Sequence, residues 1–116
     1  MDDRLERELD FSNYRLTLHN QKQSAKQRAE NMLQVQYSNS LFKADQTLIN
    51  FVKTMKDEGY SPFVVSDVHD NPVQIEDSEP FFEKLISAYA SAMNEYIISH
   101  EKIKKARNIK RLVEWE

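Results

Sequence analysis

The last long segment of the chain carries the most regular hydrophobic pattern. Large apolar residues recur there at steps of three, four or seven, the spacing that places side chains on one face of a helix. These positions are Phe82, Leu85, Tyr89, Met93, Tyr96 and Ile103. The pattern predicts a helix over about residues 78–108, and its coiled-coil-like face is expected to be buried against another helix.

The first third of the chain also predicts one long helix, over about residues 3–38. This segment contains neither Gly nor Pro and is rich in good helix formers. Its apolar positions follow a helical stripe of Phe11, Tyr14, Leu18, Ala25, Ala29, Met32 and Val35. The stripe is thin in the middle, where only two alanines stand. Two interpretations remain open: the small residues admit a helix of another chain, or the helix is solvated and held at its ends.

The middle of the chain predicts a shorter helix and a β-hairpin. Ser38, Asn39 and Ser40 mark a break after the first helix. Asp45 can cap a helix over about residues 45–58, which Gly59 would end. Two β-rich runs within about residues 63–76 flank a turn that is rich in Asp, Asn and Pro. The expected fold is one mainly α domain over residues 1–116: a long helical hairpin or bundle with one β-hairpin between its second and third helices.

Composition favours an elongated molecule with a partner. Hydrophobic residues make up 40% of the 116 residues and charged residues 30%, which leaves a compact sphere short of core. The absence of Cys excludes disulfides and thiolate metal sites. No apolar run approaches membrane-spanning length, and the acidic start predicts no signal peptide. We therefore expect a cytoplasmic protein without membrane contact.

The residues around the predicted hairpin are the only candidate for site chemistry. Asp67, His69, Asp70 and Glu76 are potential metal ligands, but their spacing matches neither a calcium loop nor a zinc protease motif. The interpretation as turn residues is therefore preferred. No nucleophile–base motif and no Gly-rich phosphate loop is present. We expect no enzyme activity, cofactor, metal or small-molecule substrate.

Two features near the C-terminus are candidate contacts. The first is a cluster of basic residues that could bind phosphate, namely Lys102, Lys104, Lys105, Arg107, Lys110 and Arg111. Alternatively, these cations complement the helix macrodipole or face the acidic start of the chain across an antiparallel helix pair. The second is the tail over residues 112–116, where Leu112, Val113 and Trp115 would either anchor in a partner's groove or fold back on the chain.

The order of features resembles small accessory proteins of T4-like marine phages. The resemblance spans most of the chain, and its first feature is a polar first helix. It is carried by four stretches: Phe42-x-x-Asp45-x-x-Leu48-Ile49-x-Phe51-Val52, Asp67-x-His69-Asp70-Asn71-Pro72, Ala92-x-Asn94-Glu95-Tyr96 and Glu101-Lys102-x-Lys104-Lys105-x-Arg107. It assigns no functional residue. It implies a place in the host cytoplasm or the virion, and a role in virion assembly or in phage transcription or replication.

These patterns together predict an interaction protein with no chemistry of its own. We expect it to self-associate through the stripe of the third helix, or to bind another protein there, as an assembly component. The alternative is a nucleic-acid-linked accessory regulator of transcription or replication that uses residues 102–111 or the Trp115 tail.

Overall fold

The computed structural model describes residues 3–115, with the side chains of residues 3–106. The elements in chain order are α1 (Asp3–Met32), β1 (Gln34–Tyr37), β2 (Ser40–Lys43), α2 (Gln46–Asp57), β3 (Phe63–Ser66), β4 (Pro72–Ile75) and α3 (Ser78–Trp115). The predicted fold class is confirmed: the protein is mainly α-helical, with a long helical hairpin and a β-hairpin between α2 and α3. The structure adds a second hairpin that the sequence analysis did not predict.

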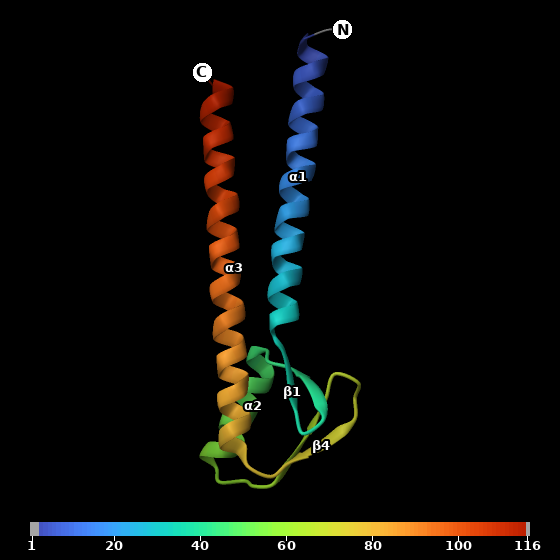
Figure 1. The fold of residues 1–116 in the computed structure, drawn as a ribbon, viewed down its shortest axis with the longest axis vertical. Helices are drawn as coiled ribbons and strands as arrows, with labels where there is room; N and C mark the ends of the chain where they lie inside the picture. Colours follow the sequence, from blue (N-terminus) through green and yellow to red (C-terminus); the bar gives the residue numbers. More distant parts are fainter. Residues whose placement is uncertain (1–2, 116) are drawn as a thin grey trace.

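The molecule is elongated, with principal extents of 69 × 24 × 19 Å. Helices α1 and α3 run antiparallel along the long axis, and α2 and the strands gather at the end opposite both termini (Figure 1). We call residues 3–32 and 92–115 the stalk, and residues 33–91 the body. The hydrophobic core lies in the body, so most of the stalk consists of two helices with no third layer over them.

Residues 33–38 do not continue the first helix, which corrects the predicted helix end near residue 38. Helix α1 ends at Met32, and β1 pairs antiparallel with β2, with Val35 opposite Phe42. The two-residue turn places Ser38 and Asn39 at φ values of 53° and 59°. Positive φ at both central residues is the backbone of the tight turns that match strand twist. The supposed break between helices is therefore a hairpin turn.

The first hairpin is tied to α1 by a salt bridge. Lys43 Nζ lies 2.8 Å from a carboxylate oxygen of Glu30. The hydrogen bond from Lys43 lowers the pKa of Glu30 below its usual 4.5, and the same bond raises the pKa of Lys43 above 10.5. The pair joins the end of the stalk helix to the body.

Helix α2 and the second hairpin follow from their local sequence signals. The side chain of Asp45 accepts a hydrogen bond from the backbone N–H of Leu48 at 2.8 Å, as an N-cap does. Gly59 has a φ of 72° just after the helix, where a side chain would be strained. Strand β3 pairs antiparallel with β4, and Pro72 begins β4 opposite Ser66. A proline is tolerated at that position because it is the first residue of its strand.

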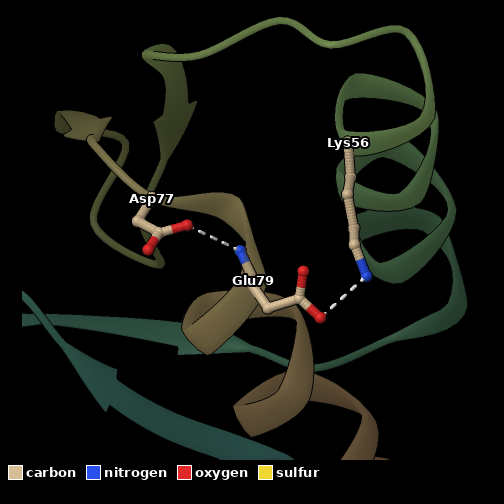
Figure 2. Close-up of polar contacts among 3 residues, drawn as sticks. All are labelled: Lys56, Asp77 and Glu79. Carbon is tan, nitrogen blue, oxygen red and sulfur yellow. Dashed lines mark hydrogen bonds and ion pairs between the residues drawn. The ribbon is translucent and has the colours of Figure 1, made fainter.

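The start of α3 is fixed by capping and by a contact with α2. Asp77 Oδ1 accepts the backbone N–H of Glu79 at 3.2 Å. The side chain of Glu79 then receives Lys56 Nζ of α2, also at 3.2 Å (Figure 2). These contacts set the position from which the whole length of α3 projects.

The core of the body is organised around two phenylalanines. Phe42 of β2 and Phe81 of α3 are fully buried, with ring centroids 5.0 Å apart. Phe81 also stacks on Tyr37 of β1 at 5.0 Å. Other fully buried side chains are Ile75, Leu85 and Val52. The core includes side chains from β1, β2, β4, α2 and α3. It therefore packs the first hairpin against the base of the stalk.

Helix α3 is longer than predicted. It was expected to end near Asn108 and to be followed by a separate apolar tail over residues 112–116, whereas the helix runs on to Trp115. The segment 112–115 is therefore helical backbone. The side chains of Leu112, Val113 and Trp115 lie outside the described part.

Candidate interaction surfaces of the stalk

The most deeply buried residues of the contact between α1 and α3 are small or polar. Ala25 and Ala29 of α1 and Ala92 and Ser99 of α3 are buried there. Arg28 of α1 donates a hydrogen bond to Ser99 Oγ at 3.4 Å. Small side chains allow two helices to approach closely but bury little apolar area. The two helices therefore use up little of the apolar surface that the stalk carries.

The buried face of α3 is shifted by one residue from the predicted stripe. Its positions are Phe81, Leu85, Ala88, Ala92, Glu95 and Ser99, at steps of four and three. All of these are buried or half-buried. Of the predicted stripe, Leu85 is fully buried and Phe82, Tyr89, Met93 and Ile103 are half-buried, whereas Tyr96 is exposed.

The lower part of the predicted stripe is covered by the chain's own helix α2. Lys56 Nζ lies 4.9 Å from the centroid of the Phe82 ring. The hydroxyl of Tyr89 is 2.7 Å from the side-chain nitrogen of Gln46, which donates to it. Phe82 and Tyr89 are thus engaged by contacts within the chain.

Two apolar stripes remain exposed on the stalk and its base. On α3, Ile86, Ala90, Met93 and Ile97 follow steps of four, three and four, and the two isoleucines are 41% and 56% exposed. We call these four residues the α3 outer stripe. It adjoins the predicted face through Met93 and borders Tyr96.

On α1, the same spacing recurs at Leu5, Leu9, Ser12 and Leu16, which we call the α1 outer stripe. Its leucines are 47%, 47% and 60% exposed. This stripe was not predicted, because the predicted stripe follows Phe11, Tyr14 and Leu18 on a different face of the helix. The regular steps of four, three and four were the available signal.

The described lysines of the basic cluster are exposed, and two of them, Lys102 and Lys104, line hollows together with basic residues of α1. Lys102, Lys104 and Lys105 are exposed, whereas the side chains of Arg107, Lys110 and Arg111 lie outside the described part. No ion pair involves the three lysines among residues 3–106. The α1 segment beside them, residues 11–29, contains no acidic residue. For these lysines, the expected pairing with the acidic start of the chain is not found.

Two hollows lie between the stalk helices. One, of about 550 Å³, has a polar lining that includes Arg28, Glu95, Ser99 and Lys102. The other, of about 200 Å³, is lined by Leu18, Lys22, His100, Ile103 and Lys104. Only the first has a carboxylate in its lining. The smaller hollow therefore combines apolar side chains with cationic and imidazole side chains.

Asp67 serves the turn of the second hairpin. Its Oδ1 accepts the backbone N–H groups of His69 and Asn71, both at 2.9 Å. The Asn71 N–H is the main reason why the pKa of Asp67 lies below its usual 3.8. Asp70 adopts a φ of 62° in the same turn. Within the described residues, no cluster of three or more His, Asp or Glu is placed to hold a metal ion.

No helix within residues 3–115 is both long enough and apolar enough to cross a membrane. Comparison of the chain with protein-family models, curated proteins and solved structures finds no match.

Proposed function

We propose that the protein is a non-enzymatic assembly component that self-associates through its stalk. The observation that carries the proposal is the pair of outer stripes. Both have coiled-coil spacing, and both present large aliphatic side chains to solvent. Exposed large apolar side chains that recur on one face of an otherwise polar helix are typical of a protein–protein contact.

The energetics support association that depends on concentration. The five leucine and isoleucine side chains of the two stripes are 41–60% exposed. Full burial of such a side chain contributes about 1.5–3 kcal/mol, so the remaining half of each contributes about 1 kcal/mol. Two copies that bury both stripes gain about 10 kcal/mol, against association costs of roughly 4–15 kcal/mol. We therefore expect a reversible oligomer.

The test is solution mass by light scattering over a concentration series from about 10 μM to about 1 mM. Two double variants remove the stripes separately: Ile86→Glu with Ile97→Glu, and Leu5→Glu with Leu9→Glu. All four positions are exposed helix positions, so the fold should survive, which far-UV circular dichroism checks. The matched control places the same substitutions on Tyr60 and Val64, which are 63% and 58% exposed in the body.

The expected result is that the wild-type mass rises with concentration, that at least one stripe variant stays monomeric, and that the control behaves as wild type. Self-association through the stalk is refuted if the wild type stays monomeric throughout. It is also refuted if the control lowers the mass as much as the stripe variants do.

A further inference from the structure

We propose that one face of the stalk binds the phosphate backbone of a nucleic acid. The face consists of Arg15, His19, Lys22 and Lys26 on α1 together with His100 and Lys104 on α3, and we call it the basic face. All six side chains are exposed. This inference goes beyond self-association, because it concerns different residues and a different class of partner.

Charge is segregated along the molecule. Residues 11–29 contain four Lys or Arg and no acidic residue, and residues 96–106 contain three Lys and one Glu. These two segments carry a formal charge of +6 in a chain whose net charge is −3, which leaves −9 for all other residues. A modestly acidic protein thus presents a locally strong positive potential, which draws polyanions to that place alone.

The register of the two helices brings the basic residues of both to one side. Lys22, His100 and Lys104 line the smaller hollow together with the half-buried Leu18 and Ile103. On α1, Arg15, His19, Lys22 and Lys26 follow steps of four, three and four and therefore share one stripe. At a rise of 1.5 Å per residue, this stripe is about 16 Å long. Along a B-form strand, phosphates recur about every 3.4 Å of axis, so the stripe spans several of them.

A linear polyanion fits this face better than a membrane surface does. The body, residues 33–91, contains four Lys and nine Asp or Glu, a net charge of −5. An anionic bilayer laid along the molecule would meet this acidic body as well as the stalk. A nucleic acid crossing the narrow stalk contacts the basic face alone. The lining of the hollow contains no Phe, Tyr or Trp ring, so we expect contact with phosphates and little readout of sequence.

The experiment measures binding of a labelled, mixed-sequence DNA duplex of about 20 base pairs by fluorescence anisotropy, between 50 and 200 mM salt. The test variant is Lys22→Gln with Lys104→Gln. One control retains the charge at both positions, Lys22→Arg with Lys104→Arg. A second control makes the same change in net charge elsewhere, Arg7→Gln with Lys53→Gln, at two exposed positions off the basic face.

Loss of two phosphate contacts, each with a salt slope of about 0.9, weakens binding about 60-fold at 0.1 M salt. We expect this loss, with a salt dependence shallower by about two units, for the Gln variant at positions 22 and 104. The charge-retaining control should stay within about threefold of wild type. The Arg7 and Lys53 control should lose far less than the test variant.

The proposal is overturned by absence of DNA binding at 50 mM salt, by equal losses in the test variant and the Arg7 and Lys53 control, or by an equal loss in the charge-retaining control. Binding to anionic phospholipid vesicles through the same lysines, without binding to DNA, also overturns it. Light scattering on the same variants separates this result from the proposed function, because the lysine changes should leave self-association unaltered.

Discussion

Two adjacent phenylalanines distinguish the observed packing of α3 from the packing that its seven-residue repeat predicts. Phe82 heads the predicted stripe, whereas Phe81 is the residue that the core buries completely. One residue along a helix rotates the side chain by about 100°. Phe81→Ala and Phe82→Ala therefore make the same chemical change on two different faces.

The structure predicts very different costs for the two substitutions. Phe81 packs against Phe42 and Tyr37, each at a centroid distance of 5.0 Å. Truncation of a core phenylalanine costs about 3–5 kcal/mol, and two lost ring pairs place Phe81→Ala at the upper end. Phe82 is half-buried beneath the ammonium group of Lys56. Its truncation should cost about 1–2 kcal/mol.

The assay is urea denaturation followed by far-UV circular dichroism, at a protein concentration where light scattering finds monomer. A domain of this size has a free energy of unfolding of about 5–15 kcal/mol. Phe81→Ala should therefore remove a third or more of the stability, and in a marginal background it should unfold the body. If Phe82→Ala lowers the free energy of unfolding as much as Phe81→Ala does, the face of α3 that packs into the core is not the one described above.

Two further predictions concern local interactions. The pKa values of Glu30 and Asp67 are lowered in the folded protein, so their stabilising contributions are present above their usual values of 4.5 and 3.8 and are lost as pH falls through the lowered values. The thermal unfolding midpoint should decrease as the pH is lowered below about 4.5, and the decrease should be smaller in Glu30→Gln. If Glu30→Gln shows the same dependence of the midpoint on pH as the wild type, the Glu30–Lys43 pair does not contribute. Asp45→Ala should cost about 1 kcal/mol, or about 4 °C in the thermal midpoint, because the N-cap of α2 is lost. Asp45→Asn should retain most of that stability, and an equal loss in both variants would argue against capping.

The elements that were predicted well are those whose ends or turns are marked by residues with restricted backbone conformations or capping side chains. Helix α2 stands between a capping aspartate, Asp45, and Gly59, and the second hairpin is organised by the Asp, Asn and Pro residues of its turn. Each of these residues restricts the backbone through its own chemistry, so the local sequence is sufficient. The mainly helical class follows from the scarcity of Gly and Pro over the remaining length.

The first hairpin was not predicted because the apolar positions of β1 fit both the period of a helix and the period of a strand. Val35 lies three residues after Met32, which continues a helical stripe, but it also lies two residues before Tyr37, which is a strand alternation. The turn residues Ser38 and Asn39 lack the glycine that usually marks a tight hairpin turn. Burial of Phe42 against Phe81 decides between the two periods, and that contact joins distant parts of the chain.

The candidate interaction surfaces stay predictions, and the structure shows only where their residues lie. A stripe on α3 and a basic cluster were visible as patterns in the sequence. Which face of α3 is buried, however, depends on the core around Phe81. The basic face depends on the register of α1 against α3, which the Arg28–Ser99 contact reports. A heptad pattern or a run of charges within one helix does not determine how that helix is aligned with the other. The sequence therefore shows which residue types recur along each helix, and only packing shows which faces they share.

The composition of the stalk explains why two kinds of surface coexist on it. A seam rich in alanine and serine holds α1 against α3 and leaves most of the larger aliphatic side chains of the stalk outside it, and no third element covers the described part of the stalk beyond the body. Leucine and isoleucine are thereby left at the outer stripes, and lysine, arginine and histidine at the basic face. Salt separates the two surfaces: screening weakens contact with phosphates steeply, whereas burial of aliphatic side chains is little affected. Rising ionic strength should therefore release a bound nucleic acid before it dissociates the oligomer, and the reverse order would mean that charge also holds the copies together.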